Sequence, residues 1–490
     1  MKKFNIFITT HSLKYIKNYI DFKRNLEKSF PETKLCVIFS TDKPIEVDLR
    51  IEDFYFLNTE DAINKKNEYN DVNAIRQNLD KFSKKVPSDL YHSDLRGTQG
   101  IRTQKMLAAE QAIILDKTEK IFKTINPDLV FVSSGTNILH SSLYFLSNSF
   151  GAKTYRVHSF LQGNINFSGF RVWFCSNNKM QLSDKAEDTF NYDIVELNKR
   201  IKDLHLALKE RLFKPDIISK KFQARRMPLN VKDFFIDLAK LIILSLSPNF
   251  KIRLKANLHL DRIKTLLNSR KNRFVETKIN DIKNPSFLFA LNTPYDSQIL
   301  VRAPEYKDFI SVIKLIAGMM PYGYDLVLRE HPAFQGMLDN RELKSLMKRY
   351  PFVKLLSSQT SLPEAINKAE SVIIFNNTAF VDTILANKPV ISLANGYFKG
   401  NNITNEINNL GDLREAFQKV INRDFVKDKS EKLKDLMIRQ FNETYPDPTT
   451  DNSEIGKIET INQGIVLKLK RIIEVYGSLK NFSEKQNVNS

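Results

Sequence analysis

The feature that most constrains the fold is the regular alternation of short apolar segments with helical patterns in the second half of the chain. The apolar segments are Ser286–Leu291, Asp325–Arg329, Phe352–Leu356, Val372–Phe375 and Val390–Leu393. Such alternation predicts a parallel sheet that is covered by helices on both faces and joined by right-handed crossovers. We therefore expect a Rossmann-like α/β domain over residues 276–425.

The first half of the chain shows a looser version of the same pattern. The expected strands are Phe4–Thr9, Lys34–Ser40, Leu129–Ser133 and Lys153–Val157. The expected helices are Ser12–Lys28, Arg102–Lys123 and Leu139–Phe150. Because a chain of 490 residues suits two domains, we predict a second Rossmann-like domain over residues 1–190, with the two domains facing a cleft.

Positive charge is concentrated between these two domains, in a predicted helical connector over residues 191–275. The formal net charge is +19, and the stretch from Arg211 to Arg273 holds 16 lysines and arginines against four aspartates. An apolar helical face around Phe234, Leu238 and Leu241 is flanked by lysines, as in helices that lie on anionic membranes. The alternative is that this face packs on a domain and the cations are simply solvated.

Residues 426–490 are predicted to form C-terminal helices with a frayed tail after Leu479. The N-terminus lacks the pattern of a signal peptide, and the apolar window Phe234–Leu246 is too short and too charged to cross a membrane. Two cysteines, Cys36 and Cys175, exclude a disulfide framework and fit a reducing compartment, so a cytoplasmic location is expected. No RNA-binding motif supports a nucleic-acid partner.

Polar residues follow three of the predicted strands in the second domain. They are Arg329-Glu330-His331-Pro332, Asn376-Asn377-Thr378 before a helix, and the loop from Asn292 to Gln298, which includes Asp296. Each group alone is typical of an ordinary strand end or helix cap. The carboxyl ends of parallel strands share one edge, so we expect a cation, an imidazole and a helix start to converge there. Such a set of donors can stabilise a departing phosphate.

Asp382 lies one helical turn after Thr378 and is placed to accept hydrogen bonds from a ribose. The structural alternative for Asp382 is an acidic residue that is favoured near a helix N-terminus. No G-x-G-x-x-G or G-x-x-x-x-G-K-[ST] pattern occurs, so the phosphate site differs from the common glycine-rich cradles.

These residues, in this order, resemble the bacterial capsule polysaccharide synthesis proteins, which are glycosyltransferases of the two-Rossmann GT-B architecture and include Kdo transferases. The resemblance runs from Phe287 to Tyr397, and a weaker similarity runs from Pro127 to Trp173. It implies transfer of a sugar from a nucleotide-activated, CMP-linked donor to a polysaccharide or lipid-linked acceptor. It also implies that His331 and the Asn377-Thr378 helix start hold the nucleotide phosphates.

The chain departs from the family pattern at several of these positions. Arg329 stands where the family often has Lys, Asn377 where it often has Ser, and Asp382 where it usually has a ribose-binding Glu. His158 stands where related chains often carry Glu. The Asp382 variant is also similar to the polyol-phosphate polymerases of teichoic acid synthesis, which use CDP-activated polyols, and this is the alternative. A non-enzymatic protein that binds polyanions or membranes is the second alternative.

The sequence contains no Asp-x-Asp pattern, so we expect transfer without a metal or other cofactor. The chemistry then requires a base or nucleophile from the first domain. The candidates are Asp94, His11 and His158, and each also has an ordinary structural role open to it. The donor-sugar loop is expected to include Asn292, Asp296 and Gln298.

Overall fold

The structure is a computed structural model, and it divides the chain into two compact units. One unit comprises Met1–Gly97, Arg102–Asp193 and Arg439–Ser490, and the other comprises Thr98–Ile101 and Ile194–Ile438. The residues that the structure describes are 3–10, 15–41, 52–59, 71–87, 90, 104–133, 137–159, 172–176, 181–183, 185–189, 195, 198–199, 202–203, 206, 231–246, 250–293, 297–300, 302–331, 335–357, 359–377, 379–424, 429–445 and 454–488.

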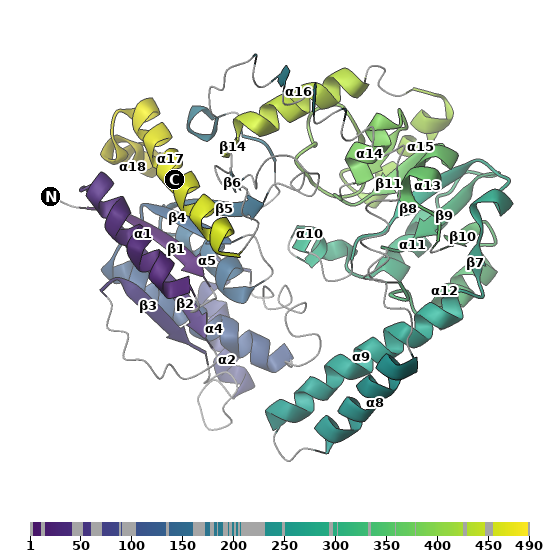
Figure 1. The fold of residues 1–490 in the computed structure, drawn as a ribbon, viewed down its shortest axis with the longest axis horizontal. Helices are drawn as coiled ribbons and strands as arrows, with labels where there is room; N and C mark the ends of the chain where they lie inside the picture. Colours follow the sequence, from purple (N-terminus) through teal and green to yellow (C-terminus); the bar gives the residue numbers. More distant parts are fainter. Residues whose placement is uncertain are drawn as a thin grey trace. The chain divides into compact units, whose positions relative to one another are not determined.

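The first unit is built on a seven-stranded sheet with the order β14-β6-β5-β4-β1-β2-β3 (Figure 1). Its strands are β1 (Phe4–Thr10), β2 (Thr33–Thr41), β3 (Phe54–Asn58), β4 (Leu129–Ser133), β5 (Lys153–Ser159), β6 (Val172–Cys175) and β14 (Thr444–Tyr445). The five strands β1 to β5 are parallel and follow the Rossmann order 3-2-1-4-5, whereas β6 is antiparallel to β5 and to β14. The order of the strands reverses between β1 and β4.

Helices cover both faces of this sheet because successive strand residues point to opposite sides. Ile6, Ile8 and Phe131 pack in the cluster that α1, α17 and α18 complete. Phe7 and Val130 pack in the cluster that α2, α4 and α5 complete. The helices are α1 (Ile16–Ser29), α2 (Val72–Phe82), α4 (Gln104–Thr124), α5 (Ile138–Asn148), α17 (Glu454–Tyr476) and α18 (Leu479–Val488).

The second unit holds an all-parallel seven-stranded sheet with the order β13-β12-β11-β8-β9-β10-β7. Its strands are β7 (Glu276–Thr277), β8 (Ser286–Ala290), β9 (Asp325–Arg329), β10 (Val353–Leu356), β11 (Ser371–Ile374), β12 (Val390–Ser392) and β13 (Asn405–Glu406). Strands β8 to β12 again follow the order 3-2-1-4-5, so the order reverses between β8 and β11.

Helices α11, α12 and α15 bury their apolar sides with Phe287, Phe289 and Leu326 on one face of the second sheet. Helices α13 and α14 contact β8, β11 and β12. These helices are α11 (Phe309–Ala317), α12 (Asn340–Arg349), α13 (Leu362–Lys368), α14 (Ala379–Leu385) and α15 (Leu413–Ile421). A long helical hairpin of α8 (Val231–Ser245) and α9 (Phe250–Asn272) also belongs to this unit (Figure 1).

The predicted α/β class with two Rossmann-like units is confirmed. The expected strands at Leu129–Ser133 and Asp325–Arg329 have the predicted bounds, and Ser361 caps α13 as the Ser-x-x-Glu pattern predicts. The structure also contains β3 and α2, which the periodicity did not reveal. The first part of the predicted helical connector, residues 191–230, lies largely outside the described residues.

The C-terminal segment differs from the prediction of separate helices with a frayed tail. Residues 439–490 group with the first unit, where β14 joins the sheet and α17 supplies core residues. The tail after Leu479 forms α18, in which Leu479 and Phe482 are buried. The segment docks because its apolar residues complete the first unit's core. The basic connector over 191–275 is likewise not separate, since α8 and α9 group with the second unit.

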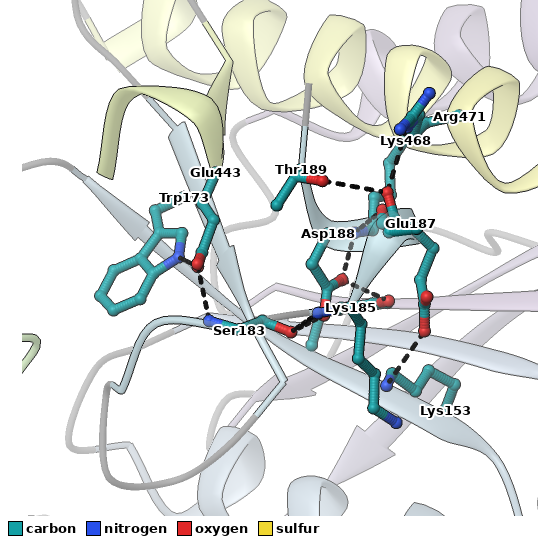
Figure 2. Close-up of polar contacts among 12 residues, drawn as sticks. Lys153, Trp173, Ser183, Lys185, Glu187, Asp188, Thr189, Glu443, Lys468 and Arg471 are labelled. Carbon is teal, nitrogen blue, oxygen red and sulfur yellow. Dashed lines mark hydrogen bonds and ion pairs between the residues drawn. The ribbon is translucent and has the colours of Figure 1, made fainter. Parts of the chain in front are cut away.

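A buried polar network also fixes this C-terminal segment (Figure 2). Lys468 of α17 forms an ion pair with Asp188 in a short 3₁₀ helix (Ala186–Asp188), and its Nζ donates to the Glu187 carbonyl at 2.5 Å. The Tyr155 hydroxyl donates to the same carboxylate at 2.9 Å. Burial alone would raise the pKa of Asp188, but the Lys468 and Lys153 ammonium groups and the Ser183 hydroxyl together outweigh burial and hold that pKa below its usual value.

Glu443, between α16 (Lys429–Asn442) and β14, makes a second anchor in the same network (Figure 2). Its carboxylate accepts hydrogen bonds from Trp173 Nε1 at 3.1 Å and from the Ser183 backbone N–H at 2.6 Å. Burial raises the pKa of Glu443 to about 8. The returning chain is thus tied to β6 by a hydrogen-bonded side chain as well as by strand pairing.

Replacing Lys468 with Met should destabilise the first unit by roughly 3–5 kcal/mol, because it leaves the Asp188 carboxylate buried without its charge partner. Urea unfolding followed by Trp173 fluorescence measures this change. Lys480→Met is the matched control, since Lys480 pairs with Glu484 at an exposed site, and it should change the free energy of unfolding by less than about 1 kcal/mol. Equal effects of the two substitutions would contradict this interpretation.

Candidate functional site

The candidate site lies at the carboxyl edge of the second sheet, where the strand order reverses between β8 and β11. Asn292 follows β8 and Asn377 follows β11. The Asn377 amide nitrogen donates to Asn292 Oδ1 at 2.8 Å and to the Ala290 carbonyl at 2.9 Å. Ligands of open α/β sheets bind in the crevice at this point of the fold, so the predicted residues lie where a ligand is expected.

Asn377 also caps the helix that follows it. Its Oδ1 accepts a hydrogen bond from the backbone N–H of Ala379 at 3.1 Å, which fixes the start of α14. Both amide hydrogens of Asn377 are used by Ala290 and Asn292. The side chain therefore positions the strand end and the helix start. Thr378 lies outside the described residues.

The neighbouring residue Asn376 joins the edge to β12. Its amide nitrogen donates to the carbonyl of Asn395 at 3.1 Å and to that of Gln298 at 3.3 Å. Gly396 packs tightly in this corner, because a Cβ atom there would lie 2.9 Å from the ring of Phe398. The Asn376 side chain thus holds together the segments after β11 and β12 and helix α10 (Ser297–Leu300). Asp296 lies outside the described residues.

Arg329 and His331 end β9 on the other side of β8. The Arg329 carbonyl accepts from the Leu291 N–H at 3.0 Å, so the end of β9 is tied to the end of β8. Two strand spacings, about 10 Å, separate the ends of β9 and β11. Arg329 and His331 are both half-buried, and Arg329 lines a small hollow with Glu276, Gln335 and Ser357. A cation, an imidazole and the α14 start therefore share one sheet edge, as predicted.

Glu330 lies between Arg329 and His331 and holds the loop that follows them. Its carboxylate accepts backbone hydrogen bonds from Gly336 at 2.9 Å and from Leu338 at 3.0 Å. Burial raises the pKa of Glu330 to about 7, and the Glu276 charge adds to this shift. Gly336 has φ +83°, and a Cβ atom there would lie 2.3 Å from the Thr265 carbonyl oxygen of α9, so only glycine fits.

Asp382 occupies the first turn of α14 and is buried, with 3% of its surface exposed. Burial raises the pKa of the Tyr397 hydroxyl, and the nearby Asp382 carboxylate adds to the effect. Asp382 therefore lies close to Tyr397, in the interior beneath the edge. Its binding of a ribose stays a prediction.

In the first unit, His158 lies near the end of β5 and is buried. Its ring packs beside Trp173 with 5.6 Å between the centroids. His11 and Asp94 lie outside the described residues. At the reversal point of this sheet, Thr9 Oγ1 and His140 Nδ1 lie 2.6 Å apart and both side chains are buried. The roles of His11, Asp94 and His158 as catalytic residues stay predictions.

Two residues with structural importance at these edges were not singled out from the sequence. In the sequence Glu330 is an acidic residue between a predicted strand and a proline. No pattern of neighbouring residues predicts that its carboxylate binds the loop that follows. His140 follows the turn after β4, at the start of a predicted helix, and only the strand order brings it to Thr9. Among the described residues, no group of three His, Cys, Asp or Glu side chains is arranged to hold a metal ion.

The comparisons with known proteins bear on the second unit. Residues 202–424 match the family model of the capsule polysaccharide biosynthesis proteins. The resemblance drawn from the sequence is confirmed for this segment. The match covers a little under half of the chain and includes the whole edge formed by β8, β9, β11 and β12.

A curated relative, Protein FixF of Sinorhizobium fredii, is 24% identical over 135 residues, which is 27% of this chain and 32% of FixF. The aligned region thus spans about a third of that relative. Among solved structures, the KpsC β-Kdo 2,7 transferase of Thermosulfurimonas dismutans is 12% identical, with a TM-score of 0.34 and coverage of 95% of this chain and 99% of that one. The UDP-GlcNAc 2-epimerase of Methanocaldococcus jannaschii is 14% identical, with a TM-score of 0.24. The match covers 88% of this chain and 98% of the epimerase.

Glu330 should make the stability of the second unit depend on pH. The folded chain holds the Glu330 proton more tightly than the unfolded chain. The stability that this proton adds to the fold is therefore fully present below pH 4.5 and is lost as pH rises through about 7. The free energy of unfolding should therefore fall by up to roughly 3 kcal/mol across this window. Glu330→Gln should remove that slope.

Urea unfolding between about pH 5 and pH 8 measures the effect of Glu330. Glu342→Gln is the control, because Glu342 is an exposed glutamate of the adjacent helix α12 and should leave the slope as in the wild type. A Glu330→Gln variant that keeps the wild-type slope would show that another group titrates.

Proposed function

We propose that the protein is a glycosyltransferase that moves a sugar from a nucleotide-activated, CMP-linked donor to a surface polysaccharide or lipid-linked acceptor. One observation carries the proposal. The family match covers the unit in which Arg329, His331 and the Asn377-capped helix start lie along one sheet edge, at the point where α/β folds bind ligands. Arg329, His331 and Asn377 are among the residues that gave the resemblance, and they also lie at that edge.

In this proposal the second unit holds the donor. Arg329 and His331 supply positive charge and N–H donors to the phosphate, and the backbone N–H groups at the start of α14 supply further donors. Asn377 and Asn292 keep that start fixed against β8. Asp382 binds the ribose, and the loop with Asn292, Asp296 and Gln298 contacts the donor sugar.

The transfer step forms a bond between an acceptor hydroxyl oxygen and the anomeric carbon as the bond from that carbon to the phosphate oxygen breaks. The electron pair leaves with the phosphate, whose charge Arg329 and His331 stabilise. The hydroxyl proton passes to a base of the first unit, for which Asp94, His11 and His158 are the candidates. We propose that the step uses neither a metal nor another cofactor.

Two other functions give different outcomes in one experiment. A polyol-phosphate transferase of the teichoic-acid type would bind CDP in preference to CMP. A non-enzymatic polyanion-binding protein would bind no nucleotide specifically, and its affinity would fall steeply with salt for every polyanion.

Thermal unfolding with CMP, CDP, UDP and GDP tests the donor assignment. CMP should stabilise the wild type most, by about 2.7 kcal/mol at 100 times its Kd. His331→Ala should remove that stabilisation and lower transfer from a CMP-sugar by about 100-fold or more, without lowering the melting temperature of the free protein. Arg414→Ala, at an exposed site in the same unit, is the control. Stabilisation by none of the nucleotides, or normal transfer by His331→Ala, would rule out the proposal.

We also propose that α8 attaches the protein to an anionic membrane surface. One side of this helix packs on α9, where Asp237 contacts His259 at 2.7 Å. The other side exposes large apolar residues, with exposed fractions of 58% for Phe235, 68% for Ile243 and 78% for Leu246. The helix thus packs on one side, as the alternative interpretation expects, and leaves apolar surface on the other, which supports the proposed attachment.

Charge complementarity selects a membrane as the occupant of this surface. The hairpin lies within the stretch that holds 16 lysines and arginines against four aspartates, and Lys240, Arg270 and Lys271 are exposed on it. Apolar side chains enter the boundary of the bilayer while cations meet anionic headgroups. In the described part of the chain, no helix is long and apolar enough to cross a membrane.

Replacing Phe235 and Ile243 together with Ser should lower binding to phosphatidylglycerol-containing vesicles by at least about 10-fold, because both apolar insertions are lost. Co-sedimentation measures this binding. Tyr322→Ser, a fully exposed aromatic residue elsewhere in the unit, should bind like the wild type. Unchanged binding by the double variant would refute this attachment site.

A further inference from the structure

Arg156 is buried in the middle of β5, in the row of residues that comes just before β4 and β1 end. Val132 of β4 pairs with Arg156 of β5, and Ile8 of β1 pairs with Phe131 of β4, so Thr9 continues the same row of residues. Residues in one row of parallel strands point to the same face. Thr9 and Arg156 therefore both face α5, on either side of Val132.

Helix α5 lies over this row and runs opposite to β5. Ser147 Oγ is 2.7 Å from Thr154 Oγ1, and one turn earlier the Tyr144 ring centroid is 4.4 Å from the Arg156 guanidinium carbon. The N-terminal half of α5 carries His140, Ser141 and Ser142, all buried. The Arg156 charge thus lies beneath the middle of this helix at Tyr144, one turn after Ser141.

The Arg156 side chain has none of its surface exposed, and its Nε, Nη1 and Nη2 atoms have no hydrogen-bond partner among the described residues. The hydroxyls of Ser141 and Ser142 are also buried without a partner in that part of the chain. Arginine remains charged in proteins, and buried charges are normally paired and hydrogen-bonded. The face of the Tyr144 ring attracts the cation. The ring does not accept the hydrogen bonds that the N–H groups donate in the plane of the guanidinium.

A structural arginine and a ligand-binding arginine differ in whether the protein itself supplies an acceptor for the guanidinium. A structural arginine would be expected to have a carboxylate or carbonyl partner, as Lys468 has in the same unit with Asp188 and Glu187. Arg156 instead offers its planar set of donors without an acceptor in the described part of the chain. A carboxylate or phosphate oxygen pair matches that set in a bidentate geometry.

We propose that Arg156, together with the polar N-terminal half of α5, binds a carboxylate or phosphate group of a ligand beside the reversal point of the first sheet. The ligand reaches the covered guanidinium when the edge of the sheet opens locally. If the proposed glycosyl transfer is correct, this anion belongs to the acceptor, either an acidic sugar or a phosphate-linked acceptor. The anion site itself does not depend on that function.

Thermal unfolding of the full chain tests the proposal with two probes, galacturonate for a carboxylate and glycerol 3-phosphate for a phosphate, each against chloride at equal ionic strength. The melting transition of the first unit in the wild type should rise with at least one probe, and the larger rise identifies the anion. Arg156→Met should start about 2 °C or more above the wild type, because it removes an unpaired buried charge, and should respond to neither probe. This assay needs no donor nucleotide and no transfer.

Arg471→Met is the matched control, since Arg471 of α17 belongs to the same unit but donates to the Ala186 carbonyl and pairs with Glu474. It should respond to the probes as the wild type does. Three results would overturn the proposal: no response in the wild type, an equal response in Arg156→Met, or an Arg156→Met variant that unfolds or melts below the wild type. The last result would show that the guanidinium holds the unit together.

Discussion

The parallel pairing of β11, β8 and β9 is the constraint on which the candidate site depends. Hydrogen bonds between parallel strands bring three carboxyl ends to one edge, although the residues that follow them are 37 to 85 positions apart in the chain. The strand order reverses between β8 and β11, so the connections leave in opposite directions and the edge is left open to a ligand. Arg329, His331 and the helix start at Asn377 owe their proximity to this topology.

The side chains at that edge divide into those that build it and those that can act on a ligand. Asn377 donates its amide hydrogens to Ala290 and Asn292. The Glu330 carboxylate accepts hydrogen bonds from the loop N–H groups of Gly336 and Leu338. These contacts leave the cation and the imidazole of the strand end held by a rigid frame. A preorganised set of donors stabilises developing charge better than a mobile one, which fits the transfer of a sugar from a phosphate.

Much of the fold was predictable because its signals are local. The strands at Leu129–Ser133 and Asp325–Arg329 are short apolar runs between helical patterns, and Ser361 caps its helix through a contact three residues away. The return of residues 439–490 to the first unit was not predictable, because Glu443 and Lys468 meet Trp173 and Asp188 across about 270 and 280 residues of sequence. Arg156 lies within the expected strand Lys153–Val157, yet its lack of a hydrogen-bond partner among the described residues is a property of the packed structure alone.

We propose that a cytidine nucleotide binds at the carboxyl edge of the second sheet, and hydrogen–deuterium exchange of the full chain with and without CMP tests this binding. Bound CMP should slow exchange in the segments that follow β8, β9 and β11 and leave exchange at the edge of the first sheet unchanged. Slower exchange confined to the first unit, or none at all at saturating CMP, would contradict it.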